Sequence, residues 1–212
     1  TVQERPCILA CKAKAISVDE SSGKAKIDYG KCTSCGMCVR QCPFGAIVDK
    51  SFLLDVVRML QESENGKNFK VYAAVAPAIA SQFSYAKLGQ VVSGLKKAGF
   101  SDVVEVALGA DIVADKEAKE LSEKGFLTTS CCPAFVQYIR SAFPQLADNI
   151  SSNASPMVET AKWIKQKDKT AKVVFIGPCI SKKMEFQKKE LAGIVAFGRL
   201  GDQGKRTSGR RS

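Results

Sequence analysis

Four cysteines lie close together near the start of the chain, and their spacing suits an iron–sulfur cube. Cys32, Cys35 and Cys38 are separated by two residues each, and Cys42 stands before Pro43. Each iron of a cube binds one thiolate, so short spacings wrap three thiolates around one cube, and the Cys–Pro turn directs the fourth to a second cube. Structural zinc is the main alternative, but zinc sites usually pair two Cys-x2-Cys knuckles across a long gap. The run therefore predicts an electron-transfer centre.

Two further cysteines, Cys7 and Cys11, lie upstream in a segment that resembles the second half of a two-cluster ferredoxin motif. The resemblance implies two ligand sets: Cys11, Cys32, Cys35 and Cys38 for one 4Fe–4S cluster, and Cys7 with Cys42 for another. Thr1 and Glu4 stand where the remaining ligands of the second cluster would fall. Because the chain starts without Met, we expect upstream residues, cysteines included, to be missing. The alternative is that Cys7 and Cys11 are ordinary small buried residues.

Composition indicates a globular chain with one small and one moderate domain, since 45% of its 212 residues are apolar and 25% are charged. No apolar stretch approaches the ~20 residues that span a bilayer, and the first residues lack the apolar core of a signal peptide. Nine cysteines without an export signal favour metal ligands and thiols in a reducing compartment over disulfides. We therefore expect a cytoplasmic protein that does not act at a membrane.

The formal charge of +11 invites the hypothesis that the protein binds nucleic acid. Residues 199–212 contribute +4 of this charge, with five Lys or Arg and one Asp. The other Lys and Arg residues are scattered along expected helical faces and are not interleaved with aromatic residues. This pattern favours a solvated surface over nucleic-acid binding. Attraction of an acidic redox partner remains a second explanation of the same charge.

The first part of the chain has the size of a ferredoxin module. From residue 16 to 49 we expect a short strand, a turn, a second strand at 25–28, the cysteine loop with a short helix, and a closing strand at 46–48. An amphipathic helix at 51–64 follows, and the polar segment 64–68 ends it. The sequence thus predicts an α+β ferredoxin-like domain over residues 1–50 and a connecting helix and linker over residues 51–68.

Beyond residue 68 the pattern changes to alternating strands and helices. The expected strands are 70–76, 103–107, 126–129 and 172–176, and the expected helices are 86–98, 112–124, 134–142 and one that begins at Ser155. This alternation is typical of β-α-β units, so we predict an α/β domain with a mainly parallel sheet over residues 69–197. Residues 198–212 contain few apolar side chains, and we expect a disordered basic tail there.

Three unusual segments follow directly after expected strands: Ala76–Ala78, Ser130–Pro133 and Gly177–Cys179. Ligands of open α/β sheets sit at the carboxyl ends of the strands, so these loops should converge on one site. Within the second segment, Cys131 and Cys132 are adjacent and point in different directions. One of them can be a metal ligand while the other stays a free thiol; the alternatives are two buried residues or a strained vicinal disulfide.

The motifs Thr128-Thr-Ser-Cys-Cys-Pro-Ala-Phe135 and Phe175-Ile-Gly-Pro-Cys-Ile-Ser-Lys-Lys-Met-Glu185, in this order behind a ferredoxin module, resemble those of the iron-only hydrogenases. The resemblance implies that residues 69–197 form the amino-terminal lobe of an H-cluster domain. It implies that Cys132 and Cys179 hold the cubane half of the H-cluster. It also implies that Cys131 is the proton-relay thiol beside the di-iron subsite and that Lys182 contacts a cyanide ligand there. Thiolates suit iron, and an ammonium facing an anionic ligand is favourable.

A third motif, which carries the remaining two H-cluster cysteines of the family, is absent from this sequence, since no cysteine follows Cys179. We therefore expect an internal fragment. Phe135 and Gly177 stand where many members have Trp and Met, which indicates a divergent subgroup. The resemblance implies reversible interconversion of H2 with protons and electrons, a soluble electron carrier such as ferredoxin, and hydrogenase maturation proteins as partners. The alternatives are a non-catalytic electron-transfer or sensory protein and a cluster-assembly factor with the same fold.

Overall fold

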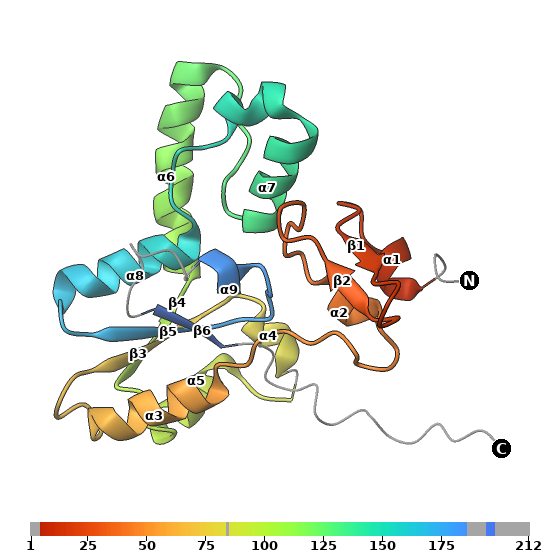
Figure 1. The fold of residues 1–212 in the computed structure, drawn as a ribbon. Helices are drawn as coiled ribbons and strands as arrows, with labels where there is room; N and C mark the ends of the chain where they lie inside the picture. The colour runs from red at the N-terminus through yellow and green to blue at the C-terminus, as the bar shows by residue number, and fades with distance from the viewer. Residues whose placement is uncertain (1–4, 84, 186–193, 198–212) are drawn as a thin grey trace.

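The computed structural model describes residues 5–83, 85–185 and 194–197 (Figure 1). The predicted basic tail at 198–212 lies outside these residues. An amino-terminal part with short elements lies beside a larger α/β part, whose helices α7 (Pro133–Ala142) and α9 (Lys182–Glu185) face it across the junction (Figure 1). Its elements are α1 (Pro6–Leu9), β1 (Ile16–Val18), β2 (Ala25–Ile27) and α2 (Met37–Gln41).

The amino-terminal part contains an antiparallel hairpin in which Ile16 pairs with Ile27. The predicted closing strand at 46–48 is wrong, because these residues take no strand conformation. Their backbone is used differently: the Ala46 N–H donates to Cys42 Sγ at 3.3 Å. A donor committed to a sulfur in this way is not available to a neighbouring strand.

The larger part is built on a four-stranded parallel sheet in the order β4-β3-β5-β6. The strands are β3 (Val71–Val75), β4 (Asp102–Glu105), β5 (Lys172–Ile176) and β6 (Ile194–Phe197). The predicted mainly parallel α/β architecture is thus present. The predicted strand at 126–129 is wrong, because only an isolated parallel bridge joins Thr128 to Ile150 there. That segment stays outside the sheet, since the Thr128 N–H donates to Asn149 O at 2.7 Å.

Helices cover both faces of the sheet, with α3 and α5 on one face and α8 on the other (Figure 1). The helices of this part are α3 (Leu53–Ser63), α4 (Ile79–Gln82), α5 (Leu88–Lys97), α6 (Ala107–Lys124), α7 (Pro133–Ala142), α8 (Pro156–Lys167) and α9 (Lys182–Glu185), with a 3-10 helix at Pro144–Asn149. Side chains of a strand alternate between the faces. Accordingly, Val174 and Ile176 pack toward α3 and α5, whereas Val173 and Phe175 pack toward α8.

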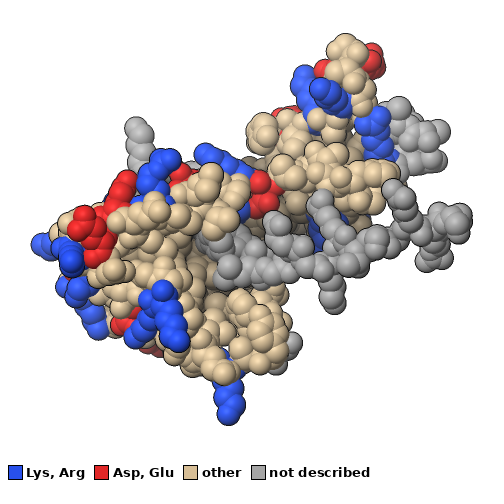
Figure 2. All heavy atoms as spheres, turned by 90° about the horizontal axis from the view of Figure 1, so that it is seen from below, with Lys and Arg blue, Asp and Glu red and all other residues tan. Residues whose placement is uncertain are grey.

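Lys and Arg side chains are spread over the molecular face seen in Figure 2, and Asp and Glu side chains lie among them. This distribution agrees with a solvated surface, which the sequence favours. In the part of the chain that the structure describes, no helix is both long and apolar enough to cross a membrane.

Candidate metal centre

The first group of cysteines is assembled from two segments, because α1 packs against α2. This packing brings the segment with Cys7 and Cys11 beside the loop that carries Cys32, Cys35 and Cys38. Burial raises the pKa of the Cys38 thiol, and the nearby Cys32 and Cys35 thiols raise it further. Thiols that influence one another electrostatically are close in space. The Cys32 and Cys35 thiols therefore lie within electrostatic reach of Cys38.

Backbone N–H groups point at several of these sulfur atoms. Cys11 Sγ accepts from Ala15 N at 3.2 Å, and Cys32 Sγ accepts from Ser34 N at 3.4 Å. Cys42 has its thiol pKa lowered, first by the Ala46 N–H and then by the Phe44 N–H. A lowered pKa favours the thiolate, which is the form that binds iron. Hydrogen bonds to the sulfurs also adjust the reduction potential of an iron–sulfur cluster.

All nine cysteines are free thiols, so the vicinal disulfide between Cys131 and Cys132 is absent. Among the residues described, no three Cys, Asp or Glu side chains lie close enough to share a single metal ion. A 4Fe–4S cluster does not need such a group, because each of its thiolates binds a different iron. The donor set, the gathered thiols and the N–H groups directed at sulfur fit a cluster of this kind.

The second group of cysteines lies on two loops that a lysine joins. Lys182 Nζ donates to the Cys131 backbone oxygen at 2.7 Å and to Glu185 Oε2 at 2.7 Å. Its side chain is only 13% exposed. Cys132 occupies the position before α7, which begins at Pro133. The chain thus brings Cys131, Cys132 and the loop with Cys179 together, although Cys179 itself is exposed.

The loop after β3 also reaches this region. Gly177 packs so closely on Ala76 that a Cβ atom at Gly177 would lie 3.0 Å from the Ala76 Cβ. Two of the three segments singled out in the sequence therefore lie side by side, each directly after the end of one of two neighbouring strands. These are 76–78, after β3, and 177–179, after β5. The third, 130–133, arrives from outside the sheet and is held by Lys182 instead. The expected convergence at the strand ends explains only the first two.

The segment before Cys131 is fixed by side-chain hydrogen bonds. The Thr129 hydroxyl accepts from the Cys131 N–H at 3.3 Å and donates to Glu117 Oε1 at 3.0 Å. The Ser130 hydroxyl donates to the backbone oxygen of Asn153 at 2.6 Å. Position and orientation of the cysteine pair therefore depend on α6, which carries Glu117, and on the loop around residue 153.

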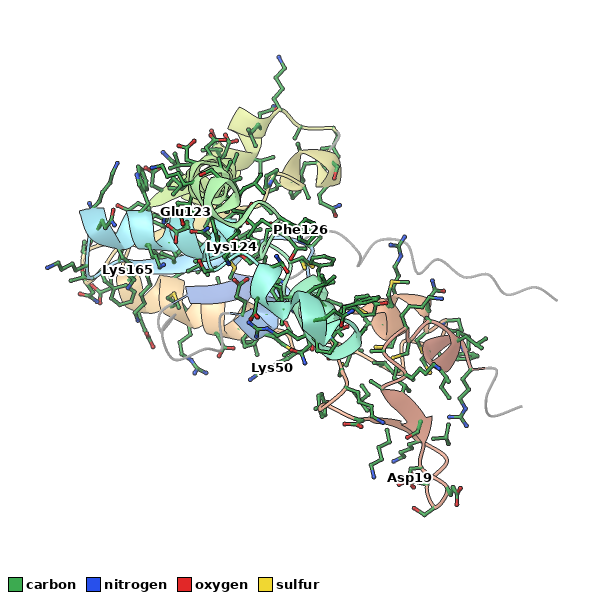
Figure 3. All side chains as sticks on the ribbon, turned by 90° about the horizontal axis from the view of Figure 1, so that it is seen from above. Asp19, Lys50, Glu123, Lys124, Phe126 and Lys165 are labelled. Atoms are coloured by element: carbon green, nitrogen blue, oxygen red, sulfur yellow. The ribbon has the colours of Figure 1, made fainter. Side chains whose placement is uncertain are left out.

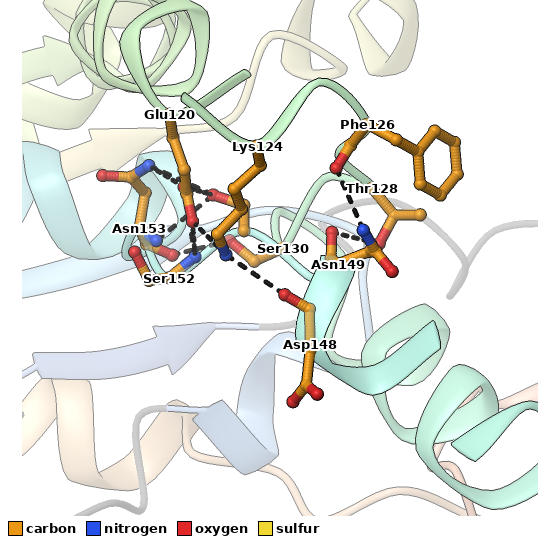
Figure 4. Close-up of polar contacts among 10 residues, drawn as sticks. Glu120, Lys124, Phe126, Thr128, Ser130, Asp148, Asn149, Ser152 and Asn153 are labelled. Carbon is orange, nitrogen blue, oxygen red and sulfur yellow. Dashed lines mark hydrogen bonds and ion pairs between the residues drawn. The ribbon is translucent and has the colours of Figure 1, made fainter. Parts of the chain in front are cut away.

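Glu120 anchors that loop to α6 (Figure 4). Its carboxylate accepts from the Ser152 N–H at 3.0 Å, from the Ser151 hydroxyl at 2.9 Å and from Asn153 Nδ2 at 2.8 Å. Lys124 Nζ lies 2.9 Å from the same carboxylate. These partners, led by the Ser152 N–H and followed by Lys124, lower the pKa of Glu120 to about 2. The carboxylate is thus charged throughout the physiological range.

A cavity of about 940 Å³ lies between the first cysteine loop and the helices α7, α8 and α9. Cys32, Ser34, Ser130 and Ser181 are among its lining residues, as is Ser155. The hydroxyls of Ser155 and Ser181 are buried and have no hydrogen-bond partner in the described parts of the chain. Ser155 occupies the N-cap position of α8, which begins at Pro156, but its side chain makes no capping hydrogen bond.

Sequence reasoning missed the residues that join the two parts of the molecule. Lys183, to which the sequence analysis assigns no role, is only 7% exposed and bonds to Asp49. Gly36 packs against Ile180, since a Cβ atom at Gly36 would lie 2.6 Å from Ile180 Cδ1. The only sign of this role in the sequence is that a glycine stands within a cysteine loop. The structure gives a reason for the glycine, because its φ of 77° is in the left-handed region.

Together, the parallel α/β fold and the two cysteine groups define an iron–sulfur type of protein. Residues 25–48 match the family model described as 4Fe-4S binding domain. Residues 69–197 match the model described as iron only hydrogenase large subunit, C-terminal domain. Because this second match covers more than half of the sequence, the chain belongs to the iron-only hydrogenase large-subunit family.

Curated relatives agree with this family. The chain is 27% identical over 186 residues to the NADP-reducing hydrogenase subunit HndD of Solidesulfovibrio fructosivorans. This alignment covers 76% of this chain and 32% of the relative. It is 28% identical over 245 residues to iron hydrogenase 1 of Clostridium pasteurianum, with 85% and 42% covered. It is also 24% identical over 185 residues to the cytosolic Fe-S cluster assembly factor NAR1 of Candida dubliniensis, with 79% and 32% covered. The chain thus spans less than half the length of these relatives.

Proposed function

We propose that the chain contributes a ferredoxin-like module and the first hydrogenase-like part of an iron-only hydrogenase. In this proposal residues 1–50 are the ferredoxin-like module, and residues 69–197 belong to the H-cluster domain. Residues 51–68 form the helix and linker that connect these two parts. The reaction is the reversible conversion of H2 into two protons and two electrons. The observation that carries the proposal is the 2.7 Å hydrogen bond from Lys182 Nζ to Cys131 O, because it joins both hydrogenase-like motifs at one place.

The residues proposed to hold metal clusters fall into three sets: Cys11, Cys32, Cys35 and Cys38 for a 4Fe–4S cluster, Cys7 and Cys42 for a second one, and Cys132 and Cys179 for the cubane half of the H-cluster. Packing of α1 on α2 supports the first set. When bound, the clusters supply one-electron redox chemistry and the H-cluster supplies the metal site at which H2 is formed or cleaved.

Cys131 is proposed as the proton-relay thiol, because a thiol both donates and accepts a proton. Its neighbour Thr129 bonds to Glu117, which places a carboxylate at the end of a short polar path from the cysteine segment. Lys182 is proposed to face an anionic ligand of the di-iron subsite. Its side chain is only 13% exposed and pairs with Glu185, and the ammonium could form an additional charge-assisted hydrogen bond to such a ligand.

Electrons are proposed to come from a soluble carrier such as ferredoxin, and the di-iron subsite from hydrogenase maturation proteins. The relatives named as hydrogenases support both partners. The clustered thiols near the molecular surface support exchange with a carrier, since Cys35 is exposed. Lys and Arg dispersed over the surface would attract an acidic carrier at low ionic strength.

The experiment is an infrared spectrum, taken after anaerobic cluster reconstitution and incubation with the hydrogenase maturation machinery, of a form that contains the complete site. Iron-bound carbon monoxide and cyanide stretches are expected in that form, because it adds to Cys132 and Cys179 the two H-cluster cysteines of the family that this sequence lacks. Iron bound without these bands would contradict the H-cluster part of the proposal and leave an electron-transfer module. No bound iron at all would contradict both parts.

Variants separate the roles of the adjacent cysteines in a form that contains the complete site. Cys131→Ser should slow hydrogen turnover while iron content stays unchanged, because a hydroxyl is a far poorer proton acceptor than a thiolate at neutral pH. Cys132→Ser should lose the cluster at that site, because it removes a thiolate ligand. Iron analysis and hydrogen evolution measure the two outcomes, and equal activity of Cys131→Ser and the unchanged protein would remove the relay assignment.

A second candidate function, cluster assembly without hydrogen chemistry, is favoured by the relationship to the NAR1 factor. The same infrared experiment distinguishes the two candidates. An assembly factor would bind 4Fe–4S clusters, pass them to an apo-acceptor protein, and show no diatomic ligand bands. Transfer of iron–sulfur clusters to apo-ferredoxin, without the bands, would therefore favour this second candidate.

A further inference from the structure

Two consecutive lysines on α9 bind different segments of the chain. Lys182 donates to Cys131 O in the loop before α7. Lys183 instead donates to the backbone oxygen of Lys50 at 2.8 Å and to the carboxylate of Asp49. Lys50 lies at the junction of the amino-terminal part and the α/β part (Figure 3). Helix α9 is therefore attached both to the second cysteine group and to the end of the first cysteine module.

The Lys183 contact is a buried interaction that depends on its partners. The Lys183 side chain is 9% exposed and that of Asp49 is 33% exposed. The Lys183 ammonium also lies 5.8 Å from the centre of the Phe52 ring. An ammonium taken out of water is costly unless a carboxylate and further acceptors compensate it. Removal of one partner while the other stays buried is destabilising, so the contact depends on both residues.

Two smaller contacts lie along the same junction. Gly36, between Cys35 and Cys38, packs on Ile180, and the Ser34 hydroxyl contacts the sulfur of Met184. Both are contacts of the first cysteine loop with the segment that follows Cys179. The first is an apolar contact, and the second is a hydrogen bond to a thioether sulfur, which is a weak acceptor. The Lys183 pair is consequently the interaction that fixes how the two cysteine loops face one another.

We propose that Lys183 is a positioning residue that clamps the cysteine loop 32–38 against the segment 179–185 through Asp49 and Lys50. The inference rests on the proposed function, because the spacing of the loops matters only if both carry clusters. Electron transfer between metal centres needs a fixed and short separation. The clamp supplies this separation without touching either proposed cluster.

The test compares Lys183→Met with the unchanged chain after anaerobic reconstitution with iron and sulfide. Hydrogen–deuterium exchange of the backbone amides at 32–38 and 179–185 should become faster, on the order of tenfold to a hundredfold, because breaking a buried pair strongly favours local opening. Exchange in β3 and β5, in the middle of the sheet, should not change. Lys183→Arg should restore slow exchange in part, and the exchanged pair Asp49→Lys with Lys183→Asp should restore more than either single change.

Lys96→Met is the matched control, because Lys96 forms an ion pair with Asp102 at 2.9 Å whose side chains are about half exposed. It should leave exchange at both cysteine loops unchanged. Unchanged exchange in Lys183→Met, or no recovery in the exchanged pair, would overturn the clamp. Iron content and the electron paramagnetic resonance spectrum of the reduced cluster are measured on the same samples. Absence of a cluster in the unchanged chain would contradict the proposed function, whatever the exchange data show about the clamp.

Discussion

Glu120 offers a direct test of how the loop next to the cysteine pair is held. Its carboxylate accepts hydrogen bonds from Ser151, Ser152 and Asn153, and Asn153 in turn accepts from Ser130. These bonds favour the charged form, and they lower the pKa of Glu120 from 4.5 to about 2. The change Glu120→Gln removes the charge but keeps the shape of the side chain. We expect it to loosen the loop that supports the cysteine pair.

The magnitude follows from the pKa difference between the folded and unfolded chain. A fall from 4.5 to about 2 corresponds to at most about 3 kcal/mol of stability, at about 1.36 kcal/mol for each pH unit. Because the folded pKa is the lower one, this stability is fully present above pH 4.5 and is lost as the pH falls toward 2. The free energy of unfolding of Glu120→Gln should therefore lie up to about 3 kcal/mol below that of the unchanged chain at pH 6. The gap should close near pH 2.

The assay is urea unfolding of the chain in reducing buffer at a series of pH values from 6 to about 2.5. Fluorescence of Trp163, the only tryptophan, reports on α8 in the α/β part. Glu123→Gln is the matched control, because Glu123 lies on the same helix and is exposed. A gap between Glu120→Gln and the unchanged chain that does not shrink with falling pH would refute the reasoning. A loss of the same size in Glu123→Gln would refute it as well.

Two glycine substitutions test close packing that the sequence does not reveal. Gly36→Ala should lower the free energy of unfolding by about 1–3 kcal/mol, because its Cβ would lie 2.6 Å from Ile180 Cδ1 and its φ is 77°. Thermal unfolding measures this loss. A second change in the same chain, Ile180→Ala, should recover the part of the loss that is due to the steric clash. Gly109→Ala should cost about 3 kcal/mol or more, because its Cβ would lie 2.1 Å from Pro156 O where α6 crosses α8. Gly94→Ala, with no atom within 4 Å of its Cβ, should instead stabilise the chain by about 0.5–1 kcal/mol in the same measurement. Equal effects at Gly94 and Gly109 would contradict the packing argument.

The alternating strand and helix pattern predicts the α/β part well, because apolar strands and amphipathic helices have distinct periods. Strands at 71–75, 102–105 and 172–176 lie where they are expected within about two residues. The errors have local causes. Segments 46–48 and 126–129 have strand-like residues, but hydrogen bonds to Cys42 Sγ and to the loop at residue 149 occupy their backbone.

The candidate site was predicted unevenly. Residue type and order singled out Cys131, Cys132, Cys179 and Lys182, since their motifs are contiguous in the chain. The supporting acids Glu117 and Glu120 carry no such signal, because they lie on a long helix rich in charged residues and differ from their neighbours only in the partners they meet. Nothing in the sequence separates these two glutamates from exposed Glu123.

The sequence by itself determines the chemistry available to this protein: clustered thiols, N–H groups a few residues away that reach the sulfurs, and a strand pattern that forms a parallel sheet. These are short-range properties, so spacing along the chain is enough to define them. Tertiary structure alone decides which of two adjacent lysines binds which part of the molecule. Lys183 meets Asp49 across 134 residues of sequence, and its burial follows from that meeting. Because a buried charge without a partner is costly, Lys183 depends on Asp49, and this pair links the segment after Cys179 to the end of the first cysteine module.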